Sequence, residues 1–231
     1  AQKAVELGFD ENCICIFPWG VDIDKFSPQA VVTAGKRWRE AQNWQDNTVL
    51  LCLRAMEANY GVDVLAKAFA IAAKKDPDLR LLLLGDGSQR SNIEKIFDEA
   101  GVSEQVWFGG RVPNDTLGTY YGAADVYVTP SHVDGSSVSL MEAMACGLPS
   151  LVSDIPANLE WVRHGENGWV FPDNDSVKLA DIIGKLKHDD WRAMAHQARQ
   201  DAQEKANWNK NKQKLFDCYQ FVHQLKDKGL A

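Results

Sequence analysis

The stretch DVYVTPSHVDGSSVSLMEAMACGLPSLVS, residues 125–153, reads as a strand, a loop, a helix and a second strand. Residues 125–129 and 149–153 are short apolar runs bounded by Pro and Gly, which is typical of buried strands. Between them, Ser136 or Ser137 is placed to cap the start of a helix. A strand, a helix and another strand in this order predict a βαβ unit and therefore a parallel sheet.

The same alternation extends through the rest of the chain. Further strands are predicted at 12–17, 48–53, 79–84, 105–109 and, as a short one, 169–171. Helices are predicted at 61–75, 91–100, 114–123, 137–146, 175–188, 191–205 and 209–227. Residues 28–47 are polar without clear periodicity and are interpreted as a long connection with at most one helical turn. The pattern predicts an α/β fold, a single Rossmann-like, doubly wound parallel sheet of about six strands with helices on both faces.

Composition excludes several classes of protein. The chain has 231 residues with 25 basic and 32 acidic side chains, so its net charge is −7. No apolar run is long enough for a membrane helix, and the acidic balance of charges argues against a general nucleic-acid binder, which needs clustered Lys and Arg. The five Cys are an odd number in mostly apolar or helical stretches, which favours reduced thiols and a cytoplasmic protein. Cys13 and Cys15 alternate along the strand predicted there, so we expect them to pack on one face.

The loop and helix after residue 129 have the features of an anion site. Free N–H groups and the helix dipole favour a phosphate at such a helix start. Glu142 lies about 7.5 Å further along the helix axis than Ser137, which is roughly the reach from a pyrophosphate to its ribose. A carboxylate can accept hydrogen bonds from a ribose diol. The alternative is a well-capped helix that carries a surface Glu.

Two other predicted strands also end in residues of interest. Arg54 directly follows strand 48–53 and could neutralise a diphosphate, or it could pair with Glu57. Gly85 opens Gly-Asp-Gly after the next strand, but Arg90 stands where a dinucleotide-binding fingerprint needs its third Gly. A tight turn is the alternative at Gly85, and an NAD enzyme is disfavoured.

Weaker candidates complete the inspection of the chain. The run Gly109–Pro113, GGRVP, could approach a planar base or merely turn. The tripeptides Asp22–Asp24 and Asp173–Asp175 could hold a divalent metal, but both have turn-like contexts, and we favour turns. His132 precedes the loop and is a candidate contact. Trp161, Trp169, Trp191 and Trp208 occupy apolar positions and are interpreted as core residues.

Several segments together resemble one family, the retaining glycosyltransferases of family 4 with the GT-B architecture. They are IFPWGVDIDKFSP, LLLLGDGSQRSNIEKI, VWFGGRVPNDTLGTYYGAADVYVTPS, DGSSVSLMEAMACGLPSLVSD and VRHGENGWVF, in the family's order from about Gly8 to about Tyr219. The resemblance implies the C-terminal, donor-binding half of such an enzyme. Residues 1–208 would be a nucleotide-sugar-binding domain and 209–231 a crossover helix, with the N-terminal acceptor domain absent from this chain.

The resemblance also assigns roles to residues. Asp134 stands where the family has a Glu and would contact the donor sugar, with Arg54 as its catalytic partner on the phosphates. Glu142 would hold the ribose. The remaining substrate-binding positions are the backbone amides of Ser136, Ser137 and Val138, the base-facing Arg111 and Val112, and Gly85. The family's usual Lys is missing, because Asn59 and Tyr60 stand in that region.

The implied function is transfer of a glycosyl group from a nucleotide-diphosphate sugar to an acceptor, with retention of configuration. The resemblance implies neither a metal nor a cofactor. The isolated chain should transfer nothing and could self-associate through its exposed interdomain face. Any peripheral contact with a membrane would be made by the missing domain. A nucleotide-sugar-binding module without activity and half of a GT-B-like sugar-nucleotide epimerase remain alternatives.

Overall fold

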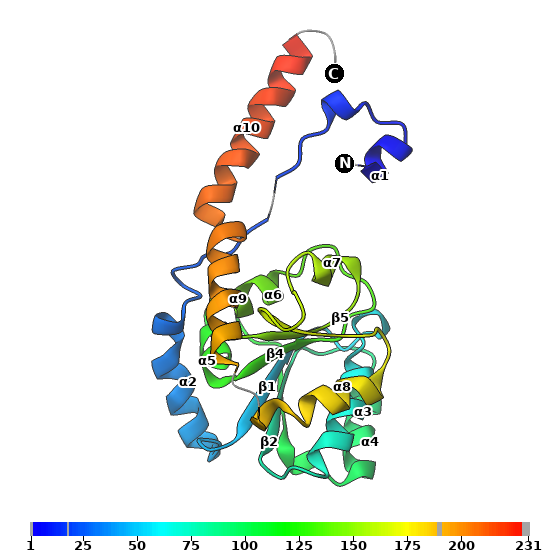
Figure 1. Cartoon of the computed structure of the whole chain (residues 1–231), viewed down its shortest axis with the longest axis vertical. Helices are drawn as coiled ribbons and strands as arrows, with labels where there is room; N and C mark the ends of the chain where they lie inside the picture. Colours follow the sequence, from blue (N-terminus) through cyan, green and yellow to red (C-terminus); the bar gives the residue numbers. More distant parts are fainter. Residues whose placement is uncertain (1, 18, 189–190, 228–231) are drawn as a thin grey trace.

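A computed structural model describes residues 2–17, 19–188 and 191–227 of the chain. Its centre is a six-stranded sheet in the order β3-β2-β1-β4-β5-β6, in which every neighbouring pair of strands is parallel (Figure 1). The strands are β1 (Thr48–Leu53), β2 (Leu79–Leu84), β3 (Val106–Gly110), β4 (Val126–Thr129), β5 (Ser150–Ser153) and β6 (Gly168–Phe171). This order and the parallel pairing confirm the predicted doubly wound fold.

Helices cover both faces of the sheet. The longer ones are α2 (Pro28–Gln42), α3 (Val62–Ala73), α4 (Arg90–Ala100), α5 (Leu117–Ala123), α6 (Val138–Ala145), α8 (Ser176–Ile183), α9 (Arg192–Lys205) and α10 (Trp208–Asp227). Short ones are α1 (Gln2–Glu6), α7 (Pro156–Leu159) and four 3₁₀ turns, η1 (Glu11–Cys13), η2 (Ala58–Tyr60), η3 (Ser103–Gln105) and η4 (Leu186–His188). Helix α3 packs against α4 and α8, whereas α2 packs against α5 and α6 against α9.

Two apolar clusters lie on opposite sides of the sheet, and β1 contributes to both. Leu50 and Cys52 belong to the cluster under α3, α4 and α8, whereas Val49 and Leu51 belong to the cluster under α2, α5, α6 and α9. All four side chains are buried, which explains why strand 48–53 is apolar without alternation. Of the four Trp residues expected in the core, Trp161 and Trp169 are buried, whereas Trp191 and Trp208 are half-buried.

The segment predicted as a long connection is largely helical, so that interpretation was wrong. Helix α2 starts at the Ser27 cap and ends at Asn43, which has the left-handed φ of 57°. Its inner face is hard to recognise because only Val31 and Gly35 are buried along it. Gly35 lies so close to α5 that an added Cβ would be 2.0 Å from the main-chain carbon of Gly122. This helix is held against α5 by close contact between the two backbones and not by a stripe of large apolar residues.

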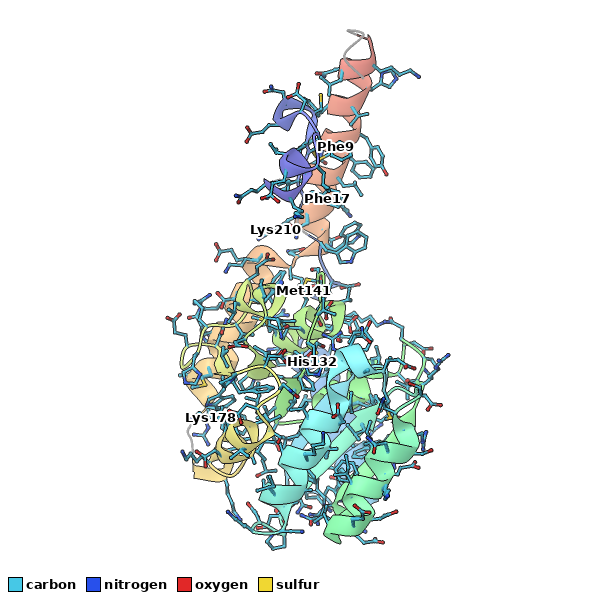
Figure 2. The ribbon with its side chains drawn as sticks, turned by 90° about the vertical axis from the view of Figure 1, so that its right-hand side faces the viewer. Phe9, Phe17, His132, Met141, Lys178 and Lys210 are labelled. Carbon is cyan, nitrogen blue, oxygen red and sulfur yellow. A yellow bond between two sulfur atoms is a disulfide. The ribbon has the colours of Figure 1, made fainter. Side chains whose placement is uncertain are left out.

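The N-terminal segment does not enter the sheet, which corrects the strand predicted at 12–17. Residues 11–13 form the turn η1, and the segment runs beside α10, away from the sheet (Figures 1 and 2). A disulfide joins Cys15 to Cys218 of α10 across 203 residues of sequence. The expectation of reduced thiols was therefore wrong for this pair, and Cys13 is exposed, not packed. We call residues 2–17 and α10 the arm, and residues 20–188 and 191–207 the body.

Several helix boundaries also differ from the predictions, and those of α4 and α8 are two of them. Helix α4 begins at Arg90, one residue before the predicted start, and has no side-chain cap. Glu94 instead accepts a hydrogen bond from Arg90 at 2.9 Å. Helix α8 ends at Ile183, and the 3₁₀ turn η4 takes up the end of the helix predicted at 175–188.

Candidate functional site

The strand order reverses between β1 and β4, so the loops after these two strands leave the sheet in opposite directions. Ligands of open parallel α/β sheets bind in the crevice that this divergence creates at the carboxyl ends. Here Arg54 follows β1, and the chain after β4 runs through residues 130–137 into α6. The structure thus places Arg54, Asp134 and Ser137, three of the residues selected from the sequence, at the switch point.

Arg54 is fixed from three directions. Its Nε donates to Thr129 Oγ1 at 2.9 Å, its Nη2 donates to Ser137 Oγ, and Nη2 lies 2.8 Å from Asp134 Oδ2. The guanidinium also stacks on the ring of Tyr60, 5.6 Å from the centroid. Burial alone would lower the pKa of Arg54, but Tyr127, Asp134 and other neighbours more than offset it and raise that pKa. Arg54 therefore stays a cation at this edge of the sheet.

Asp134 supplies the counter-ion of Arg54. Its Oδ1 accepts a hydrogen bond from the N–H of Gly135 at 2.8 Å, while Oδ2 is buried against the guanidinium. The contact of Oδ2 with Arg54 has the distance of an ion pair but not the angle of a hydrogen bond, so this oxygen keeps its accepting capacity. The alternative pairing of Arg54 with Glu57 does not form, because Glu57 accepts from the N–H of Ser88 at 2.9 Å.

Helix α6 starts at the same place. Ser137 is its N-cap and accepts a hydrogen bond from the N–H of Leu140 at 3.2 Å, as one of the two predicted caps. Ser136 is exposed before the cap, and Val138, the first helical residue, is also exposed. The free N–H groups of this first turn face the switch point, where they can receive an anion together with Arg54.

Glu142 lies in the middle of α6 and is buried, which excludes the alternative of a surface carboxylate. Only 5% of it is exposed, and its Oε2 accepts a hydrogen bond from the hydroxyl of Tyr121 at 2.8 Å. Burial raises the pKa of Glu142, and Tyr121, Lys25 and Asn114 offset part of that rise. Lys25 in turn donates to Asn114 Oδ1 at 2.6 Å, so a cation from the chain before α2 reaches the neighbourhood of this carboxylate.

The carboxyl ends of β2 and β3 lie on the β1 side of the switch point, away from β4 and α6. Gly85 has a φ of 119° and donates its N–H to the carbonyl oxygen of Gly110 at 2.7 Å. An added Cβ at Gly85 would lie 2.1 Å from the carbonyl oxygen of Arg54, so only glycine fits there. Arg111 is exposed and Val112 is half-buried against the α2 side of the core. Gly85 thus brings the chain after β2 against Arg54 with no side chain between them.

The two Asp-x-Asp tripeptides behave differently. Asp22 accepts from the N–H groups of Asp24 and Lys25, both at 3.0 Å, and Asp175 caps α8, as expected of turns. Asp173, however, follows β6 and meets His132, with 2.6 Å between Oδ1 and Nδ1. Within the described ranges, no three or more His, Cys, Asp or Glu side chains gather as metal ligands would.

Four residues of the site were missed by sequence reasoning. They are Tyr121, Thr129, Lys25 and Asn114. Thr129 could have been found from its position as the last residue of a predicted strand. The other three carry no such signal, because they reach Glu142 from distant parts of the chain.

The described helices include none with the length and apolar content required to cross a membrane.

Comparison with known proteins gives a consistent result. Residues 35–207 match the family described as glycosyl transferases group 1. A GDP-mannose-dependent alpha-(1-6)-phosphatidylinositol monomannoside mannosyltransferase of Mycolicibacterium smegmatis is 30% identical over 185 residues, which cover 77% of this chain and 48% of that protein. This chain spans about half the length of the curated relatives that it matches.

Solved structures agree on the fold. Sucrose-phosphate synthase from Thermosynechococcus elongatus superposes with a TM-score of 0.80 at 26% identity, over 90% of this chain and 52% of that one. Anabaena HepE in complex with UDP-glucose gives a TM-score of 0.77 at 21% identity, over 97% of this chain and 59% of that one. Because the family match runs from α2 to the end of the body and the sheet is that of one GT-B half, the chain belongs to the glycosyl transferases group 1 family.

Proposed function

We propose that this chain is the donor-binding half of a retaining glycosyltransferase that takes its sugar from a nucleotide-diphosphate sugar. One observation carries the proposal: Arg54 is held at the first turn of α6, and the buried Glu142 lies five residues beyond the cap on the same helix. The diphosphate would lie between Arg54 and the N–H groups around Ser137. Glu142 would accept the ribose hydroxyls through Oε1, while Tyr121 holds Oε2.

The charges suit the reaction. Cleavage of the bond between sugar and phosphate leaves negative charge on the nucleoside diphosphate. Arg54 and the dipole of α6 are fixed before the reaction and would stabilise that charge as it develops. Asp134, whose Oδ2 retains accepting capacity, would turn from Arg54 to the hydroxyls of the donor sugar. Backbone groups near Arg111 and Val112 would contact the base. Neither a metal nor a cofactor takes part in this proposal.

The kind of donor is supported by the similar proteins. One relative is described as GDP-mannose-dependent, and one structural neighbour was solved with UDP-glucose. Both ligands are nucleotide-diphosphate sugars, which is the class proposed here. The two differ in base and in sugar, so the choice between them belongs to the binding experiment.

A test of the proposal is calorimetric titration with UDP, GDP and ADP, each with and without EDTA. We expect one of them to bind, with an affinity that EDTA leaves unchanged. Glu142→Ala should weaken this binding by about 1–3 kcal/mol, since a charged acceptor is lost. Glu104→Ala removes an exposed Glu and serves as the matched control. No heat with any nucleotide would refute the assignment.

Sugar transfer would need more than this chain. We propose that the acceptor is bound by a separate domain, because the chain spans about half of its relatives and donor and acceptor must be aligned. The isolated chain should therefore bind the donor without transferring it. Comparing donor turnover by this chain and by a longer protein that contains it, over a panel of acceptors, tests the point. Equal turnover would contradict it.

A further inference from the structure

His132 and Asp173 form a pair at the carboxyl edge of the sheet that the proposed function does not use. His132 lies in the loop after β4, two residues before Asp134, and Asp173 lies in the loop after β6. The Nδ1 atom of His132 is 2.6 Å from Asp173 Oδ1, and both side chains are about one-third exposed or less. Figure 2 labels His132 within the body, further from the arm than Met141.

The pair joins several loops of this edge into one chain of hydrogen bonds. The N–H of His132 donates to the carbonyl oxygen of Asn59 at 3.0 Å, on the β1 side of the switch point. On the other side, the N–H of Asp173 donates to Asp154 Oδ1 at 2.8 Å, which ties in the loop after β5. His132 is therefore the residue that links the β1 side of the site to the β6 side.

The residues just after His132 have few other restraints. Val133 is 60% exposed, and Gly135 and Ser136 are exposed as well. Between His132 and the cap at Ser137, the side chain of Asp134 contacts Arg54 and accepts a hydrogen bond from the N–H of Gly135. If Asp134 is to leave Arg54 for a sugar, the direction of the loop is set by its two ends, His132 and Ser137.

We propose that His132 and Asp173 are a positioning pair that aims Asp134 at the donor sugar. The inference rests on the proposed function, because it assumes that Asp134 faces the sugar. The pair acts on the sugar side alone, since the diphosphate is held by Arg54 and the start of α6. It should therefore raise affinity for a nucleotide sugar without raising affinity for the bare nucleoside diphosphate.

The test compares the two kinds of ligand on a set of variants. His132→Ala and Asp173→Ala remove the pair, and His132→Asn keeps a donor near the place of Nδ1. His196→Ala on α9 is the control for loss of an imidazole. Each variant is titrated with UDP, UDP-glucose, GDP and GDP-mannose, and hydrogen exchange of residues 131–137 is measured without ligand.

We expect both Ala variants to bind the nucleotide sugar about fivefold more weakly, the effect of one hydrogen bond, and the nucleoside diphosphate within about twofold of wild type. His132→Asn should recover most of the loss, and the double Ala variant should be no weaker than either single one. Equal losses for sugar-bearing and bare ligands would overturn the proposal, as would a failure of His132→Asn to recover.

The two hypotheses can fail separately. If wild type binds none of the four ligands, the proposed function fails, and the exchange experiment alone decides on the pair. Faster exchange of 131–137 in His132→Ala that His132→Asn restores would support the positioning role. Exchange that is the same in all variants would overturn it, whatever the ligands do.

Discussion

The carboxyl edge of the body and the arm are built in opposite ways. At the edge, polar side chains form hydrogen bonds and ion pairs with one another, and the side chain of Arg54 is only 10% exposed. On the arm, apolar side chains face outward: Phe216 is 55% exposed and Tyr219 67% exposed. Figure 1 shows α10 extending away from the layers of the body, with the N-terminal segment beside it.

The difference lies in what holds each region. The edge is held by the folded strands that end there, so its geometry exists before any ligand arrives. The arm is joined to the body at the start of α10, where the N–H of Trp208 donates to the carbonyl oxygen of Val21 at 3.1 Å and Asn211 Nδ2 donates to that of Lys205 at 2.7 Å. Further along the arm, the Cys15–Cys218 disulfide joins the N-terminal segment to α10. The edge keeps its shape through contacts within the body, whereas the arm exposes the kind of surface that promotes self-association.

The largest effect should appear at the edge, on Arg54. Replacing Arg54 by Met removes the cation and two charge-assisted hydrogen bonds to neighbours, so nucleoside diphosphate binding should weaken by about 3 kcal/mol, or roughly 100-fold. Calorimetry with the best-binding nucleoside diphosphate measures it.

A second variant at the same ion pair provides the contrast. Asp134→Asn removes the charge that competes with the diphosphate for Arg54, so the bare nucleoside diphosphate should bind at least as tightly as to wild type. Equal weakening by the two substitutions would mean that the pair holds the fold of the edge and not the ligand.

A second prediction concerns packing in the body. Gly35→Ala places a methyl group 2.0 Å from the main chain of Gly122, and the backbones of α2 and α5 must separate to admit it. We expect a loss of about 2–3 kcal/mol in the free energy of unfolding. Gly184→Ala is the control, because its new Cβ would meet its nearest neighbour, Ala180, at an ordinary 3.4 Å. Denaturant titration of both variants should show a large shift for the first and almost none for the second.

The same contrast explains how much could be predicted from the sequence. Strands such as 48–53 and 79–84 were predicted to the residue, because burial on both faces makes each of them a continuous apolar run. Helix α2 was missed because a glycine contact leaves no periodic apolar stripe. The segment 12–17 is apolar enough for a strand, but it lies on the arm, where the described residues include no strand to pair with it.

For the site, the useful signal was a residue's position at the end of a predicted strand or helix. Contacts between residues far apart in the sequence could not be predicted. Arg54 and Ser137 were found because each stands next to a predicted element end, and parallel strands bring such ends together. Tyr121 and Asn114 were not found, since their contacts with Glu142 depend on how α5 and the loop before it pack. Asp173 was assigned to a turn because nothing in its own segment indicates His132.

The third prediction concerns the disulfide within the arm. The disulfide links Cys15 to Cys218, which are 203 residues apart in the sequence. In the folded chain both residues lie on the arm. Disulfides typically stabilise a fold by about 2–4 kcal/mol, mainly by restricting the unfolded state, and we expect the lower end, about 2 kcal/mol, because this bond lies on the arm and not in the body. Thermal unfolding of Cys15→Ser against wild type measures this, and Cys13→Ser, which should leave the bond intact, is the control. An unchanged midpoint for Cys15→Ser would mean that the bond does not form or that the arm is independent of the body.

The fourth and smallest effect is a pH dependence at Glu142, in which binding and stability should change in opposite directions. Burial raises the pKa of Glu142 above its value in the unfolded chain. The folded state therefore holds this proton more tightly, so the contribution of Glu142 to stability is fully present at low pH and is lost as pH rises through the raised pKa. Ribose hydroxyls need the ionised carboxylate, so nucleotide binding should weaken as pH falls through the same pKa, by up to about 1.4 kcal/mol per pH unit.

Glu142→Gln should flatten both profiles. Protonation of the ligand's own phosphate also changes binding in mildly acidic solution, but it affects both proteins equally and cancels when they are compared at each pH. Calorimetry and thermal unfolding over the same pH series give the two profiles. If the wild-type and Gln proteins lose affinity in parallel on acidification, Glu142 does not touch the ribose, and its burial beside Tyr121 is a feature of the core of the body alone.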